Sequence, residues 1–429
     1  MSALSQPPPA WTSAFAAWLT PRRLRAQATV LALCVWSICA LDLATPGMFD
    51  RAGNIKFQDF IQFYVSARLI AQGRASQLFD QQVTFDELRR IVYQSSELPP
   101  TRVRLPPVYG PQVGLLFRPF ANLSFPAAAP LWATLSLILY FSCVAAVWRS
   151  CANLREHPRI VALAAIAFPP LFHTFIRGQI SVLLLACFTA AWLALRADRP
   201  WLVGLALGLL VCKPQFLVAI PVVLLVAGAW RTLAATILSA SAQLALTWLL
   251  FGTAVMRAYF NTLWNMSPYM AAVEPGIAHI QMHSLRSFWA LLLPWPNISM
   301  ALYVFTSIPA VVLAAAVWKS SSNAALRFAA LTLAAVLVNP HLFVYDLLVL
   351  APALLLLADW ALSVQAKSLF VDRFRVLTYF AFVLPILGPL ARWTHIQLSV
   401  IAYASLLWLL WHGSNRAKRQ FVSATFANP

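Results

Sequence analysis

Acidic residues are scarce in this chain of 429 residues, where 13 Asp and Glu stand against 31 Lys and Arg. Charged residues of all kinds make up only 10% of the chain, whereas a soluble domain carries roughly 25%. Hydrophobic residues make up 61% and the mean hydropathy is +0.73. Too little polar surface is therefore present to cover a soluble fold, and disordered or collagen-like proteins are excluded as well. The composition predicts an all-α polytopic membrane protein.

Cysteine and glycine are also sparse, which excludes several kinds of site. The six cysteines contain no C-x-x-C spacing, so neither a disulfide framework nor a zinc site is predicted. The 13 glycines are scattered and form no phosphate-binding loop, which disfavours a nucleotide-sugar donor. Basic residues are spread over many loops and are not clustered with aromatics, so nucleic acid is not a predicted partner.

Long apolar runs make up most of the sequence. A membrane-spanning helix needs about 20 mostly apolar residues, and twelve runs approach this length, with a further half-length stretch at 284–295. The twelve predicted spans are 27–45, 126–148, 160–176, 179–195, 201–212, 215–230, 232–252, 297–318, 324–338, 342–362, 374–391 and 395–412.

The basic residues orient these spans. With the N-terminus in the cytoplasm, the short inner segments carry 17 Lys and Arg and the short outer segments carry five. This asymmetry follows the positive-inside rule and places both termini inside. The predicted layout is a cytoplasmic tail 1–26, a membrane domain 27–412 and a cytoplasmic tail 413–429. Arginine exceeds lysine and alanine is abundant, which favours a GC-rich bacterium and hence its inner membrane.

Two outer segments are long enough to roof a site on the periplasmic face. They are the first loop, 46–125, and the segment 253–296. Asp59 lies in the first loop before apolar residues spaced as in a helix, which predicts an amphipathic helix along the membrane interface. Asp59 with Gln62 resembles a capping box, while a carboxylate facing the bundle would suit a general base. Both interpretations stay open on the sequence. Four prolines between 106 and 119 exclude one continuous helix and suggest a re-entering strand.

Several short motifs follow one another along the chain in a characteristic order. Asp59-Phe60, Leu78-Phe79-Asp80, Arg118-Pro119 and Trp132 are followed by Gly178-Gln179, Lys213-Pro214-Gln215, Asn339-Pro340-His341 and Tyr345-Asp346. Over roughly residues 55–350 this arrangement resembles glycosyltransferase family 87, whose members are GT-C type membrane enzymes that use a polyprenyl-phosphate-mannose donor. Leu105 stands where the family usually has Tyr before Pro-Pro, and no second acid adjoins Asp59.

The resemblance implies that Asp59 is the catalytic base. A sugar on a lipid phosphate already has a good leaving group, so the enzyme must deprotonate an acceptor hydroxyl and hold the departing phosphate. Direct displacement inverts the anomeric centre. The implied partners are a polyprenyl-phosphate-sugar donor, a lipid-linked or glycan acceptor and membrane lipids, and no metal or other cofactor is expected.

The remaining candidates surround breaks between predicted helices. Lys213 and Arg177 lie at outer breaks and are candidates for the donor phosphate, although such cations also snorkel to lipid phosphates. His341 follows another break and is a second catalytic candidate, either orienting Asp59 or contacting the phosphate; a structural helix-end role is equally consistent. Tyr345 would face the same way four residues later. Candidates for donor phosphate or sugar binding also include Gln179, Gln215, Arg68, Tyr64 and Asp346.

Three other interpretations compete. His279 and His283 with Glu274 resemble a metal face on a helix, but a third well-placed ligand is missing and no metal is predicted. Two helix breaks like those at Lys213-Pro214 and Asn339-Pro340 are also a feature of secondary transporters. A transporter, however, has no need of an eighty-residue outer loop. A non-catalytic lipid-binding protein would share most of these features.

Overall fold

The computed structural model describes residues 10–93, 108–265, 280–364 and 368–426. Every regular element in these ranges is a helix, and the β-type contacts found there are two isolated bridges, Phe49 with Ile55 and Met282 with Phe343. The prediction of an all-α protein is therefore confirmed.

Six segments are long and apolar enough to cross a membrane within the described residues. They are α2 (Pro21–Leu43), α6 (Phe125–Trp148), α12 (Trp230–Trp264), α16 (Pro296–Ser320), the segment Val344–Ser363 with η6 (Val344–Val349) and α18 (Leu350–Ser363), and the segment Leu369–Thr394 with α19 (Leu369–Val383), η7 (Leu384–Leu390) and α20 (Ala391–Thr394).

A seventh span is bent. Helices α7 (Pro158–Ile166) and α8 (Pro169–Arg177) meet at 45° and together satisfy the same test. Phe168, between them, has extended backbone angles, as expected for a residue that precedes a proline. The chain is thus a multi-pass membrane protein.

The other predicted spans are shorter apolar helices. They are α9 (Ser181–Arg196), α10 (Pro200–Gly208) with η4 (Leu209–Cys212), η5 (Pro214–Leu217) with α11 (Ile220–Val226), α17 (Ala324–Leu337) and the apolar part of α21 (Leu398–Phe426). Prolines start or separate several of them, because proline lacks the amide that a helix interior needs. The total of twelve spans stays a prediction. Helix α15 (Leu285–Leu292) occupies the half-length stretch.

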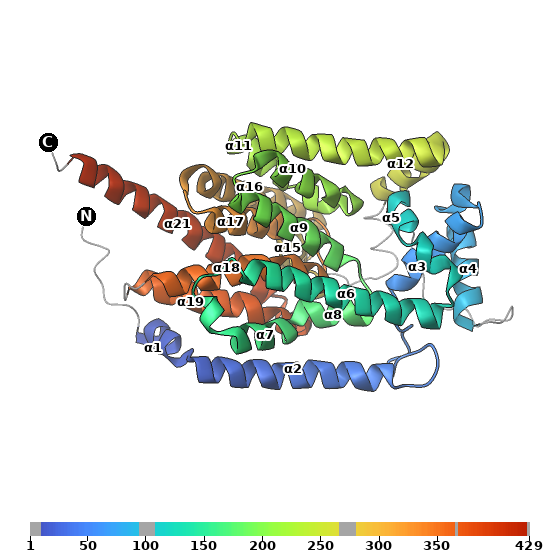
Figure 1. Ribbon diagram of the computed structural model, residues 1–429, viewed down its shortest axis with the longest axis horizontal. Coiled ribbons are helices and arrows are strands. Elements are labelled where there is room, and N and C mark those ends of the chain that lie inside the picture. The colour runs from blue at the N-terminus through green and yellow to red at the C-terminus, as the bar shows by residue number, and fades with distance from the viewer. Residues whose placement is uncertain (1–9, 94–107, 266–279, 365–367, 427–429) are drawn as a thin grey trace.

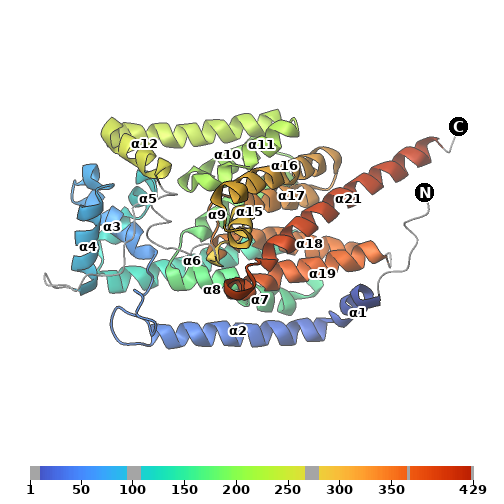
Figure 2. The ribbon, with the colours of Figure 1, turned by 180° about the vertical axis from the view of Figure 1, so that it is seen from behind.

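The helices run mostly along one axis, with the first loop gathered at one end (Figures 1 and 2). Helices α3 (Phe60–Ala71), α4 (Gln81–Tyr93) and α5 (Pro111–Leu116) form that end. Helix α1 (Ala10–Trp18) and the C-terminal part of α21 lie at the other end, while α2 and α12 follow opposite sides of the bundle.

The first loop folds partly as expected. The predicted helix after Asp59 is present as α3, but it is buried on most of its surface, and its location along the membrane interface stays a prediction. The predicted strand is wrong: Pro111 starts α5, and Arg118–Asn122 form the 3-10 helix η2. Proline suits the first position of a helix, where its missing amide has no partner to lose.

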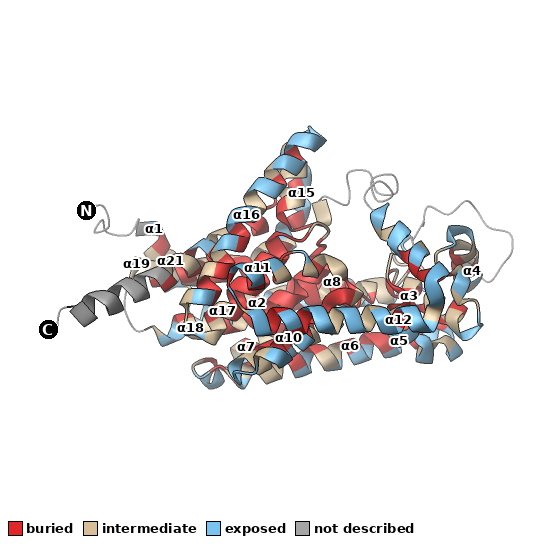
Figure 3. Cartoon of the chain, turned by 90° about the horizontal axis from the view of Figure 1, so that it is seen from above, coloured by how far each residue is buried: buried red, intermediate tan, exposed pale blue. Residues whose placement is uncertain are grey.

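The core gathers around α17. Residues from Phe328 to Leu337 are all buried, as expected for a helix that is apolar on every side. Figure 3 shows long exposed stretches on α12 and α16, where Leu249 is 83% and Phe305 is 70% exposed. Apolar side chains this exposed would be costly in water, and they fit a lipid-facing surface.

Candidate functional site

The site begins where the end of α8 meets the start of α3. The Asp59 backbone N–H donates to the Arg177 carbonyl oxygen at 3.0 Å. Gly178 follows Arg177 in the left-handed conformation, with φ of +67°, and a Cβ there would lie 2.6 Å from Phe60 Cβ. Only glycine fits both this backbone and this close approach. Trp132 Nε1 donates to the Gly178 carbonyl oxygen at 2.9 Å and fixes the junction.

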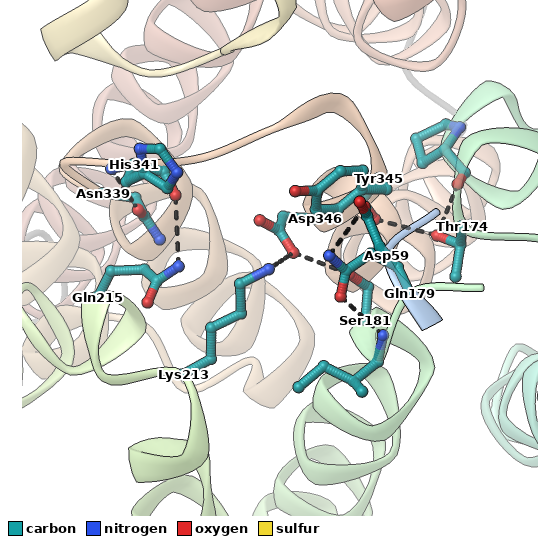
Figure 4. A network of polar contacts seen from close by, with 12 residues as sticks. Asp59, Thr174, Gln179, Ser181, Lys213, Gln215, Asn339, His341, Tyr345 and Asp346 are labelled. Atoms are coloured by element: carbon teal, nitrogen blue, oxygen red, sulfur yellow. Dashed lines mark hydrogen bonds and ion pairs between the residues drawn. The ribbon is translucent and has the colours of Figure 1, made fainter. Parts of the chain in front are cut away.

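The Asp59 side chain turns toward the bundle and does not cap its own helix. Asp59 occupies the N-cap position of α3 without a capping hydrogen bond, so the capping-box interpretation is wrong. Instead, Gln179 Nε2 donates to Asp59 Oδ2 at 3.1 Å, and Arg177 Nη1 lies 4.0 Å from Asp59 Oδ1. Asp59 is only 6% exposed, and Figure 4 shows its carboxylate beside the Gln179 amide.

Burial and the neighbouring cations shift the pKa of the Asp59 carboxyl group in opposite directions. Burial raises the pKa of Asp59 above its ordinary value, and the negative charge of Asp346 adds to this effect. Arg177, the Gln179 hydrogen bond and Lys213 lower the same pKa. A carboxylate with a raised pKa accepts a proton more readily, which is the property a general base requires.

A buried ion pair adjoins Asp59. Lys213 Nζ lies 2.5 Å from Asp346 Oδ1, and their side chains are 4% and 0% exposed. Ser181 Oγ donates to the same carboxylate oxygen at 2.8 Å, whereas Asp346 Oδ2 has no hydrogen-bond partner among the described residues. The snorkelling interpretation is therefore wrong for Lys213. Its backbone has left the helical region between η4 and η5, as expected for a residue before Pro214.

Two tyrosines connect the acid and the ion pair. Lys213 Nζ lies 4.9 Å from the centre of the Tyr345 ring and 5.9 Å from that of Tyr109. The Gln179 amide N–H donates to the Tyr109 hydroxyl oxygen at 3.0 Å. Burial raises the pKa of Tyr109 to about 12, so its hydroxyl stays protonated. Thr174 Oγ1 donates to the Tyr345 carbonyl oxygen at 3.2 Å and holds the start of η6 against α8.

The segment 253–296 contributes a further contact through Gln281. Arg177 Nη2 donates to Gln281 Oε1 at 3.1 Å, and the Arg177 guanidinium lies 5.9 Å from the Tyr345 ring centre. Gln397 Nε2 donates to the carbonyl oxygens of Ile280 and Met282 at 2.9 and 3.1 Å. The backbone on both sides of Gln281 is therefore anchored, and Gln281 is held against Arg177.

The described residues do not support the interpretation of His279, His283 and Glu274 as a metal site. His283 is buried and its Nδ1 lies 2.7 Å from Ser399 Oγ, while His279 and Glu274 fall outside the described residues. No group of three or more potential metal ligands is found in the described ranges.

Tyr64 and Arg68, two of the predicted residues, lie away from Asp59. The Tyr64 hydroxyl donates to the Leu123 carbonyl oxygen at 2.6 Å, and Arg68 Nε donates to Glu87 Oε1 at 2.9 Å. At about 100° per residue, positions 64 and 68 point roughly 140° and 180° away from position 59 around a helix. The structure therefore shows contacts between loop elements for both side chains.

His341 and Gln215 form a separate group. Gln215 Nε2 donates to the His341 carbonyl oxygen at 3.4 Å, and Asn339 Oδ1 accepts from the His341 backbone N–H at 2.9 Å. In Figure 4 this group lies on the side of Lys213 and Asp346 away from Asp59. The expectation that Tyr345 follows His341 on one helical face is wrong, because η6 starts only at Val344.

The arrangement thus joins residues distant in sequence into one charged cluster. Asp59, Arg177, Gln179, Lys213, Tyr345 and Asp346 were all predicted candidates, and the structure brings them together. Tyr109, Ser181 and Gln281 were missed as site residues. Ser181 was detectable as a polar residue just after Gln179 at the start of an apolar run, whereas Gln281 carries no comparable signal.

The fold and the site together define a class: a multi-pass membrane protein with a buried acid beside two cations. The chain matches glycosyltransferase family 87 over residues 108–352, more than half of its length, and it belongs to that family. No curated protein and no solved structure matches it. Family membership indicates a glycosyltransferase, and the matched region contains every cluster residue named above except Asp59, which precedes it.

Proposed function

We propose that the protein is an inverting, GT-C type glycosyltransferase. It moves a sugar, most consistently mannose, from a polyprenyl-phosphate donor to a hydroxyl of a membrane-associated glycolipid or glycan. The observation that carries this proposal is the buried carboxylate of Asp59 beside Arg177 and close to Lys213. The choice of mannose as the sugar rests on the resemblance of the sequence motifs to those of glycosyltransferase family 87.

Asp59 acts as the general base. Its Oδ2 is oriented by Gln179, while the partner of its Oδ1 among the described residues is the distant Arg177 guanidinium at 4.0 Å. An acceptor hydroxyl that hydrogen-bonds to Oδ1 loses its proton to Asp59 as its oxygen attacks the anomeric carbon. The bond from that carbon to the phosphate oxygen breaks, and the phosphate leaves with the electron pair. Attack from the side opposite the phosphate inverts the configuration.

Arg177 is the primary cation for the departing phosphate. Its side chain is 24% exposed and thus more accessible than that of Lys213. Asp346 already neutralises Lys213, so the ammonium acts mainly through its fixed position and field. Guanidinium and ammonium groups supply the positive charge that the reaction requires, and we therefore propose that no metal ion participates.

The site faces the periplasm of a bacterial inner membrane in this proposal. Support comes from the bias of basic residues toward the segments assigned to the cytoplasm. The helices α3, α4 and α5, at the same end as Asp59, also lie opposite α1 and the C-terminal part of α21 (Figure 1).

The test is glycosyl transfer by the purified protein in detergent. Radiolabelled polyprenyl-phosphate-mannose is offered with a panel of membrane glycolipids and glycans. We expect transfer by the native protein, loss of at least about 100-fold for Asp59→Asn, and unchanged donor binding. Asp86→Asn is the matched control, since Asp86 lies in the same loop and accepts a hydrogen bond from Gln82. Full activity of Asp59→Asn would overturn the base assignment.

A further inference from the structure

A charged cavity lies at one end of the helices α9, α10 and α17. Helix α9 begins with Ser181 beside Asp346 and ends at Arg196. Helix α10 begins at Pro200 and leads through η4 to Lys213, and α17 begins at Ala324 and ends before Asn339. Since α9 alone has 16 residues, about 24 Å separates its two ends. The cavity is therefore distinct from the Asp59 cluster.

Three arginines line this cavity, which has a volume of about 340 Å³. Arg199, Arg231 and Arg327 are balanced by Asp198 alone among the charged lining residues. No ion pair within 4.0 Å involves any of these three arginines in the described part of the chain. The cavity thus has an excess of positive charge, and no acidic group among the described residues lies within ion-pair distance of its arginines.

Arg327 has the features of a binding residue that awaits a ligand. Its guanidinium lies 4.9 Å from the Trp318 ring centre, and Trp318 is buried beneath it. Arg327 Nε is buried without a hydrogen-bond partner among the described residues. Buried donors are nearly always satisfied in native proteins, so this N–H points to an acceptor that the described residues do not supply.

Two helix starts add to the positive field. Helices α10 and α12 begin at Pro200 and Trp230, which both line the cavity, and neither has a side-chain cap. The first amides of a helix have no partner within it and carry partial positive charge. Arginines and uncapped helix starts together form the kind of site that binds phosphate.

We infer that this cavity binds a phosphate group, with the phosphodiester of an anionic phospholipid as the source that the surroundings favour. Trp201 and Trp230 are 50% and 63% exposed, and Leu202 next to them is 54% exposed. Exposed tryptophans are typical of the membrane–water interface, and basic pockets between membrane helices bind anionic lipid headgroups. The lipid's acyl chains would lie along the exposed apolar side chains of α10 and α12.

The experiment compares lipid and free phosphate as ligands of the full-length protein. Binding is measured by native mass spectrometry in detergent, with phosphatidylglycerol, with phosphatidylcholine and with inorganic phosphate in separate titrations. We expect preferential retention of phosphatidylglycerol. Arg231→Gln and Arg327→Gln each lower that affinity by about fivefold. Lys319→Gln is the control, because it removes an exposed positive charge at the same end without lining the cavity.

Each outcome decides the inference. Loss of phosphatidylglycerol in the arginine variants but not in Lys319→Gln supports a lipid phosphate site. Equal binding of inorganic phosphate, lost in the same variants, supports the phosphate site and assigns it to a soluble source. Equal losses in all three variants, or unchanged binding in both arginine variants, overturn it. Arg231 is exposed, so its variant gives a readable result even where Arg327→Gln impairs folding.

Discussion

Asp59 and Arg177 are joined through both backbone and side chain. The Asp59 N–H donates to the Arg177 carbonyl oxygen at 3.0 Å, while their charged groups stay 4.0 Å apart. The backbone bond fixes where the carboxylate lies. The longer separation leaves the Arg177 field acting on Asp59 without a direct hydrogen bond between the two side chains.

This relationship predicts how activity depends on pH. In the proposed mechanism transfer needs the ionised carboxylate, so we expect activity to fall as pH drops through the Asp59 pKa, which burial raises above its ordinary value. Arg177 lowers that pKa. Arg177→Gln is therefore expected to move the acid limb of the profile of kcat/KM to higher pH, in addition to lowering its height.

Arg257→Gln provides the control for that profile, because Arg257 is an exposed cation in the C-terminal part of α12. Its acid limb should coincide with that of the native protein. An acid limb that stays in place in Arg177→Gln would show that a group other than Asp59 titrates.

Gln179 should matter through the orientation of Asp59. Gln179→Leu keeps the approximate size of the side chain but removes its hydrogen bonds to Asp59 and Tyr109. Because small displacements of a catalytic group are costly, we expect kcat to fall by about 10- to 100-fold with little change in donor KM. Steady-state kinetics measure both constants, and a rise in KM with unchanged kcat would instead assign Gln179 to donor binding.

Lys213 and Asp346 should depend on each other energetically. Lys213→Met leaves a buried carboxylate unpaired, and Asp346→Asn leaves a buried ammonium, so each change should cost about 3–5 kcal/mol. The double variant should be less destabilised than the sum of the two losses. Thermal unfolding in detergent provides the measurement, and strict additivity would contradict a direct pair in the folded protein.

Gly178 should tolerate no side chain. Gly178→Ala imposes the left-handed conformation on alanine, at about 1–2 kcal/mol, and also places Cβ 2.6 Å from Phe60 Cβ. We expect lower thermal stability and lower activity together. Gly73→Ala is the matched control, since Gly73 has φ of +72° but no atom within 4 Å of the added Cβ. Equal losses in the two variants would show that close packing at Gly178 is unimportant.

Gln281 should act on the donor through Arg177. Gln281→Leu removes the acceptor of the Arg177 Nη2 hydrogen bond, which frees the guanidinium to adopt other rotamers. We expect a higher donor KM and a smaller effect on kcat, measured by varying the donor at saturating acceptor. Unchanged donor KM would place Gln281 outside the binding machinery.

The composition of the chain explains why much of the site could be predicted. Ionisable residues are rare among apolar ones, so Asp59, Arg177, Lys213 and Asp346 stand out individually, and prolines mark the breaks near them. Sequence did not indicate that Lys213 would pair with Asp346, because 133 positions separate them and tertiary packing decides the contact. Tyr109 escaped assignment for a related reason: only the fold brings it to Gln179.

The structure departs from expectation mainly where a local sequence pattern was used to infer how side chains lie relative to one another. Tyr64 and Asp59 lie on different sides of α3, because a helix rotates neighbouring positions apart, and the role of Tyr64 in donor binding stays a prediction. His341 lost its expected relation to Tyr345 because the chain does not resume a helix until Val344. Proline predicts that a helix is interrupted, but it does not specify whether a strand, a 3-10 turn or a new helix follows.

The short lengths of α9 and α17 have a consequence for membranes of different thickness. These helices have 16 and 14 residues and extend about 24 and 21 Å, less than the roughly 30 Å of a typical hydrocarbon layer. A helix of this length that lies along the bilayer normal has at least one end inside the hydrocarbon layer. If Arg177 holds the donor phosphate as proposed, a bilayer of longer acyl chains lengthens the descent of that phosphate, and we expect turnover to depend on the elastic cost of local thinning.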